Sequence, residues 1–72
     1  MNKFWNLGEV FHLYRNLEAI VRFDEPHNNF LQEKLREWEK IYLRSKYYGR
    51  VSKKDFKALD RIDSEIYISI PL

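Results

Sequence analysis

The sequence predicts a mainly α-helical protein, a single small helical domain over residues 1–72. We expect a small three-helix bundle: a long antiparallel helix pair plus a short third helix, with an extended or strand-like C-terminal tail. Two observations support this prediction. Apolar residues recur at helical spacing along three segments, each of which begins with a residue that favours a helix N-terminus. Gly and Pro number only two each, which indicates few turns and long elements.

The first helix is predicted over Leu7–Arg22. Asn6 is a suitable N-cap, and Glu9 lies three residues later in a capping-box arrangement. The apolar residues of this segment cover an arc that is wider than the stripe needed to pack against one neighbour. They are Leu7, Val10, Phe11, Tyr14, Leu17 and Val21, with Leu13 and Ile20 extending the arc. The width indicates a central helix that touches two others, or one that also meets a second subunit.

The second helix is predicted over Phe30–Tyr48, after a break around Pro26. Asn29 and Gln32 have the spacing of an N-terminal cap, and Gly49 suits the left-handed conformation that ends many helices. Its inward stripe comprises Leu31, Leu35, Trp38 and Tyr42, widened by Phe30, Ile41 and Tyr48. A short break between two long helices favours antiparallel packing.

The third helix is predicted to start at Ser52, with Asp55 three residues later and an inward row of Phe56, Leu59 and Ile62. In residues 65–70 the period changes, because Ile66, Ile68 and Ile70 alternate with other residues as in a half-buried strand. A lone strand is unstable, so we expect this tail to pack as an extended segment, to pair with its copy in a dimer, or to add to a partner's sheet.

The composition limits how the domain is stabilised and where it works. A chain of 72 residues buries a small core, and with no cysteine it has neither disulfides nor thiolate metal sites. That leaves good packing or oligomerisation. The N-terminal residues lack the apolar core of a signal peptide, and no run approaches the roughly 18 apolar residues of a membrane span. We therefore expect a cytoplasmic protein without a membrane partner.

The charge is concentrated in residues 40–57. This stretch carries seven basic residues and one acid, Asp55, for a net charge of +6, whereas residues 1–39 and residues 58–72 each carry −2. Tyr42, Tyr47 and Tyr48 lie among the cations. Cations interleaved with aromatic residues are typical of surfaces that bind a polyanion or an acidic protein.

One candidate binding site is the outer side of the second helix. Arg36, Lys40, Leu43 and Tyr47 recur at i, i+4, i+7 and i+11, opposite the inward stripe. We expect them to anchor a protein or nucleoprotein with an acidic surface, because Tyr and Arg dominate interface hot spots. The supporting residues are Arg44, Tyr48 and Arg50. The alternative is an ordinary solvated helix surface with a stray leucine.

A second candidate site, for nucleic acid, lies at the start of the third helix. It consists of Arg50, Lys53, Lys54, Lys57 and Arg61. The arrangement resembles a helix-turn-helix, but the second helix is too long for that motif. The third helix also carries Asp55, Asp60 and Asp63, which would repel phosphates. The simplest alternative is a solvated basic surface.

The sequence offers no sign of catalysis. No serine lies in a nucleophile motif and no glycine-rich phosphate loop exists, and His12 and His27 have no second ligand at metal spacing. Asp24, Glu25 and His27 crowd one turn, where they are best explained as capping and turn residues. We therefore expect no enzyme activity, no cofactor and no metal site.

These observations lead to the hypothesis of a non-enzymatic interaction protein that binds and modulates a larger target. In composition it resembles the small accessory proteins of bacteriophages and mobile elements, which are short, cysteine-free, aromatic-rich and helical. The resemblance implies inhibition or redirection of a larger host machine. The first alternative is a small nucleic-acid-binding regulator that uses the basic residues 44–61. The second is a structural homodimer subunit joined through the first helix and the 66–70 tail.

Overall fold

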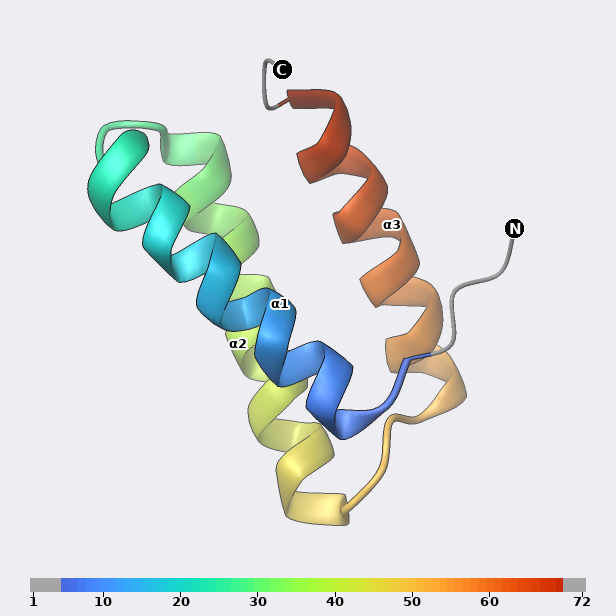
Figure 1. Cartoon of the computed structure of the whole chain (residues 1–72). Coiled ribbons are helices and arrows are strands. Elements are labelled where there is room, and N and C mark those ends of the chain that lie inside the picture. The colour runs from blue at the N-terminus through green and yellow to red at the C-terminus, as the bar shows by residue number, and fades with distance from the viewer. Residues whose placement is uncertain (1–4, 70–72) are drawn as a thin grey trace.

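A computed structural model describes residues 5–69 and shows three helices that run up, down and up (Figure 1). The first helix, α1 (Leu7–Ala19), continues directly into a π-helical segment, η1 (Ile20–Asp24). It is followed by α2 (Asn29–Tyr48) and α3 (Lys53–Ser69). The prediction of a mainly helical three-helix bundle with an antiparallel first pair is confirmed. The central helix is α2 rather than the first helix, because the backbones of both α1 and α3 lie close to that of α2.

The first helix ends differently from the prediction. The α-helical hydrogen bonding stops at Ala19 rather than Arg22, and the chain widens into the π-helical turn of η1. The backbone N–H of Glu25 donates to the carbonyl of Ile20 at 2.8 Å, which closes this wider turn. The turn keeps Val21 buried, next to Leu17 and Leu31.

The cap of α2 is Asn28, not Asn29. The Asn28 side-chain oxygen accepts a hydrogen bond from the Leu31 backbone N–H at 3.1 Å, so Asn29 is already the first helical residue. The side-chain amide of Gln32 donates to the Pro26 carbonyl at 2.6 Å and does not form the predicted capping-box bond. The predicted end is confirmed, since Gly49 adopts a left-handed φ of 75° and its N–H bonds to the Ser45 carbonyl.

The third helix is longer than predicted. Ser52 caps it as predicted, because its hydroxyl oxygen accepts from the Asp55 N–H at 3.2 Å, but the helix then runs for 17 residues to Ser69. Residues 65–69 are therefore helical, and the strand prediction is wrong for them; Ile70 lies outside the described residues. Ile66 continues the inward row into the core. Glu65 is held by Lys34 of α2 at 2.6 Å and by Arg61 one turn earlier at 3.0 Å.

The two tryptophans tie the elements together. The Trp38 indole N–H of α2 donates to the Val10 carbonyl of α1 at 2.9 Å. Trp5 precedes α1, packs edge-on against Trp38 with ring centroids 5.3 Å apart, and donates to an Asp60 carboxylate oxygen of α3 at 2.7 Å. Around them lie buried residues from all three helices, including Leu59 and Ile62 of α3. Trp5 thereby helps to hold α3 onto the α1–α2 pair.

Within residues 5–69, no helix combines the length and the apolar character that a membrane span requires.

Candidate interaction surface

The predicted binding residues on the outer side of α2 do face outward. Arg36, Lys40, Leu43 and Tyr47 are all exposed, with 53% of Leu43 and 84% of Tyr47 accessible to solvent. The opposite side of the helix carries Leu31, Trp38 and Ile41 into the core, and this burial fixes which side remains outside. An exposed leucine and an exposed tyrosine therefore lie one turn apart with cations beside them, as the sequence predicted.

Tyr48 lies at the end of α2 and is exposed, although its position on the helical wheel predicted a flank of the inward stripe. Its ring packs edge-on against Tyr47, with ring centroids 5.0 Å apart. Phe30, the other flanking aromatic residue, is also exposed. Two adjacent aromatic rings therefore stand outside the core at the end of α2.

Arg44 joins α2 to α3 through a bidentate ion pair with Asp55. The Arg44 Nε and Nη2 atoms lie 2.8 Å and 2.6 Å from the two Asp55 carboxylate oxygens. The Asp55 side chain is only 5% exposed, whereas that of Arg44 is 52% exposed. Sequence reasoning treated Arg44 as a supporting contact for a partner and missed this internal role. The available signal in the sequence was Asp55, the only acid among the seven basic residues of residues 40–57.

The ion pair shifts the pKa of both groups. The hydrogen bond from Arg44 lowers the pKa of the Asp55 carboxyl below its ordinary value, although burial of the carboxyl opposes this shift. The hydrogen bond to Asp55 raises the pKa of the Arg44 guanidinium. Both groups are therefore charged at neutral pH. The negative charge of Asp55, the single acid of residues 40–57, is thus compensated within the protein by Arg44.

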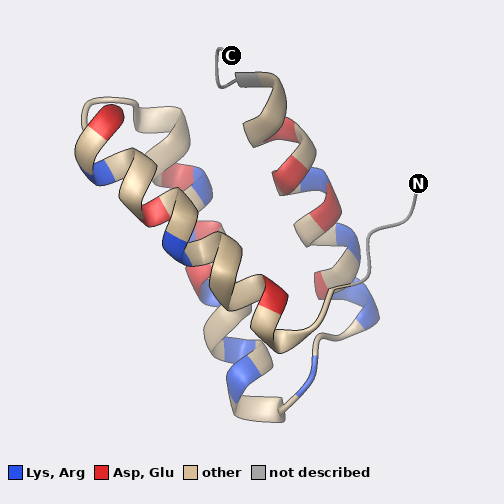
Figure 2. Cartoon of the chain, viewed as in Figure 1, with Lys and Arg blue, Asp and Glu red and all other residues tan. Residues whose placement is uncertain are grey.

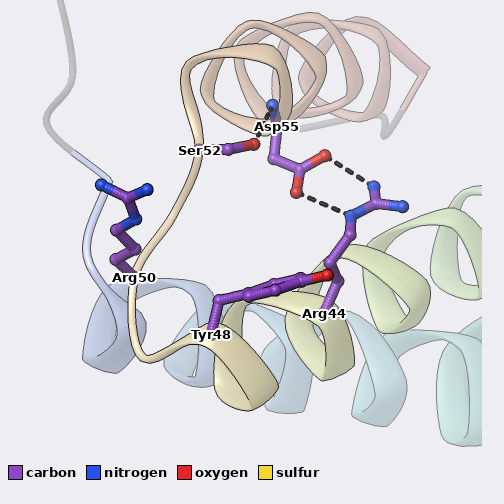
Figure 3. A pocket seen from close by; sticks show the side chains of 5 residues that line it. All are labelled: Arg44, Tyr48, Arg50, Ser52 and Asp55. Atoms are coloured by element: carbon purple, nitrogen blue, oxygen red, sulfur yellow. Dashed lines mark hydrogen bonds and ion pairs between the residues drawn. The ribbon is translucent and has the colours of Figure 1, made fainter.

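A hollow of about 240 Å³ opens beside this ion pair (Figure 3). It is lined by Arg44, Tyr48, Arg50, Ser52 and Asp55. Figure 3 shows the Tyr48 ring beneath the Arg44–Asp55 pair, and the Ser52 side chain pointing toward Asp55. Arg50 comes from the connection between α2 and α3. The residues come from the end of α2, the connection and the start of α3, which the Gly49 turn brings together.

A second hollow, of about 220 Å³, lies farther along the same two helices. Its polar lining consists of Glu37, Lys40 and Arg44 from α2 and Arg61 from α3, above Ile41 and Ile62. Arg61 bonds to Glu65 at 3.0 Å and lies 3.4 Å from Glu37. Arg44 lines both hollows, so they are neighbours along the junction of α2 and α3.

The cations gather at one end of the bundle. Figure 2 shows them on the last turns of α2, the connection and the first turns of α3. Arg44 pairs with Asp55, the only acid of this stretch, and the other six cations of the stretch make no ion pair within residues 5–69. They are Lys40, Lys46, Arg50, Lys53, Lys54 and Lys57. Opposite charges elsewhere are more evenly matched, as in the pairs of Glu18 with Arg15 and Arg22.

The residues predicted to bind nucleic acid occupy two different surroundings in the structure. Arg50, Lys53, Lys54 and Lys57 are exposed near the start of α3, but Arg61 lies two turns farther on, among Glu37 and Glu65. Asp60, predicted to repel phosphates, accepts the Trp5 hydrogen bond. The structure therefore places Arg61 with Lys40 in the lining of the second hollow.

The predicted dimer surface contains a smaller hollow of about 110 Å³ between α1 and α3. It is lined mainly by Leu13, Leu17, Ile20, Trp38 and Ile66, so the first helix and the start of the predicted tail border the same hollow.

The histidines do not come together. His12 lies against Asn16 on the exposed side of α1, and His27 is exposed in the turn before α2. In the part of the chain that the structure describes, no group of three or more His, Cys, Asp or Glu side chains could hold a metal ion.

Comparison with known proteins adds no assignment: no family model, curated protein or solved structure matches this chain.

Proposed function

We propose that this protein is a non-enzymatic interaction protein that docks on an acidic surface of a larger protein and modulates that protein. The observation that carries the proposal is the meeting of two features at one end of the molecule. One is the exposed Leu43–Tyr47 anchor on α2, and the other is the group of cations without ion pairs in the described residues. An apolar anchor supplies affinity, while surrounding charge supplies orientation and association rate.

The anchor has the size and exposure of a hot-spot pair. A tyrosine buries a large apolar area at low entropic cost, and Tyr47 already packs on one edge against Tyr48, which limits its freedom. Arg36 and Lys40 lie on the same side of α2. A partner with an apolar pocket rimmed by carboxylates would complement this surface.

The experiment is a binding comparison between two double variants. Leu43→Ala/Tyr47→Ala removes the anchor. Phe23→Ala/Ile68→Ala removes one aromatic and one aliphatic side chain elsewhere, with exposures of 81% and 83% against 84% for Tyr47 and 53% for Leu43. The proteins are used to capture partners from the source cells, and each captured protein is then purified and titrated directly.

The anchor variant is expected to weaken binding of the direct partner by about 30-fold or more in Kd, which corresponds to about 2 kcal/mol. The control variant is expected to bind like the wild type. If a purified partner binds the anchor variant as tightly as the wild type, the proposal is wrong.

A second candidate function is that of a nucleic-acid-binding regulator. The observation in its favour is that Arg50, Lys53, Lys54 and Lys57 are exposed together and make no ion pair in the described residues. Binding of this kind has a characteristic salt dependence, with log affinity falling by about 0.9 per phosphate contact for each unit of log salt on duplex DNA. A low-salt electrophoretic shift with duplex and single-stranded DNA and RNA tests it, and no shift with any of them removes this candidate.

A further inference from the structure

The junction of α2 and α3 has properties that the exposed anchor does not explain. Two hollows, of about 240 and 220 Å³, lie along it and share Arg44. Each contains one cation without an ion pair in residues 5–69, Arg50 in the first and Lys40 in the second. We refer to Lys40, Arg44, Tyr48, Arg50 and Arg61, together with the two hollows, as the seam.

We infer that the seam binds an extended acidic segment of the partner, with one acidic side chain entering each hollow. This inference rests on the proposed function, since it names the part of the partner that the basic end recognises. A carboxylate in the first hollow would meet the unpaired Arg50. A carboxylate in the second hollow would meet the unpaired Lys40 beside Arg44 and Arg61, two arginines that keep further N–H groups available.

The spacing of the seam matches an extended chain. Lys40, Arg44 and Tyr48 follow one another at i, i+4 and i+8 on α2, so neighbouring positions are separated by about 6 Å along the helix axis. In an extended segment, every second side chain points the same way, at intervals of about 6.6 Å. Acidic residues two positions apart would therefore match the spacing of these positions along α2, while the residues between them face away.

The internal acids of the seam favour a peptide over a nucleic-acid strand. Asp55 and Glu37 line the two hollows, and each already has an arginine partner, Arg44 and Arg61 respectively. A nucleic-acid strand carries a charge at every phosphate and would place several of them near these carboxylates. An acidic peptide can place uncharged residues there instead. The seam also exposes one stacking ring, Tyr48, whereas Tyr47 belongs to the anchor on the outer side of α2.

The test uses a peptide of alternating Glu and Ser, and its block isomer with the same composition but all Glu at one end. Binding is followed by nuclear magnetic resonance titration at low salt, where exposed charges are least screened. The alternating peptide is expected to bind more tightly, with the largest shifts at Lys40, Arg44, Tyr48, Arg50 and Arg61. Equal binding of the two isomers would overturn the spacing argument and with it the inference.

Two variants with equal charge loss locate the site. Lys40→Ala/Arg50→Ala removes the unpaired cation of each hollow, whereas Lys53→Ala/Lys57→Ala removes two cations that line neither hollow. All four residues are exposed, so both variants should fold, which thermal unfolding checks. The seam variant is expected to weaken peptide binding about tenfold and the control less than about threefold.

Equal losses in the two variants would mean that the peptide senses only diffuse charge, and would overturn the inference while leaving the Leu43–Tyr47 proposal standing. An oligothymidylate that binds the wild type more tightly than the peptide, and loses affinity through Lys40→Ala/Arg50→Ala, would assign the seam to single-stranded nucleic acid and also overturn it. Failure of the proposed function is separate, since it is decided by the anchor variant and the purified partner.

Discussion

The Arg44–Asp55 ion pair should make a measurable contribution to the stability of the fold. Arg44→Met keeps much of the apolar stem but removes the two hydrogen bonds that Arg44 donates to the Asp55 carboxylate, which is 5% exposed. Removing one partner of a fully buried pair costs about 3–5 kcal/mol, and the half-exposed position of Arg44 reduces this to about 2–3 kcal/mol. Asp55→Asn leaves the Arg44 guanidinium where water can reach it, so we expect this variant to lose only about 1–2 kcal/mol of unfolding free energy.

The assay is a double-mutant cycle, with urea unfolding followed by far-ultraviolet circular dichroism at neutral pH. A domain of 72 residues has a free energy of unfolding of about 4–10 kcal/mol, so all three variants should remain folded and measurable. We expect a coupling energy of about 1.5–2.5 kcal/mol between the two positions. A coupling below about 0.5 kcal/mol would refute the reasoning, because the two single losses would then be independent.

Three further predictions concern stability. Ser45→Ala should raise the free energy of unfolding by about 0.5–1.5 kcal/mol in urea titrations, because the Ser45 hydroxyl is buried without a hydrogen-bond partner in the described structure and alanine is the better helix former; an unchanged or lower value would contradict this. Trp5→Phe should lower the free energy of unfolding by about 1–2 kcal/mol, because the indole hydrogen bond to Asp60 is lost. If Trp5→Phe costs as much in an Asp60→Ala background, this hydrogen bond is not responsible. Because the folded-state pKa of Asp55 lies below its ordinary value near 4, its stabilisation is complete above that value and is lost as the pH falls through the lowered pKa. The urea midpoint should therefore drop more steeply between about pH 5 and pH 3 in the wild type than in Arg44→Met, and parallel curves would rule out this origin.

Helical periodicity and caps predicted the parts of the fold that depend on local chemistry. Asn6, Ser52 and Gly49 each satisfy backbone groups of their own helix, so their roles could be read from neighbouring residues. The outward position of Leu43 and Tyr47 followed from the apolar residues on the opposite side of α2.

Long-range contacts explain what sequence reasoning missed. The alternating isoleucines of residues 65–70 fit a strand, but Glu65 is fixed from α2 by Lys34, and Ile66 reaches a core that only the assembled bundle provides. The same holds for Trp5, whose partners Trp38 and Asp60 are far away in sequence. The pairing of Asp55 with Arg44 depends on the geometry of the turn between α2 and α3, which neither residue reveals alone.

The most direct test of the central claim is lysine footprinting of the complex with the purified partner. Acetylation rates of Lys40 and Lys46, which flank the Leu43–Tyr47 anchor, should fall strongly when the partner binds. Unchanged rates at Lys40 and Lys46 in a saturated complex would contradict the account, because the partner would then bind somewhere other than the basic end of α2.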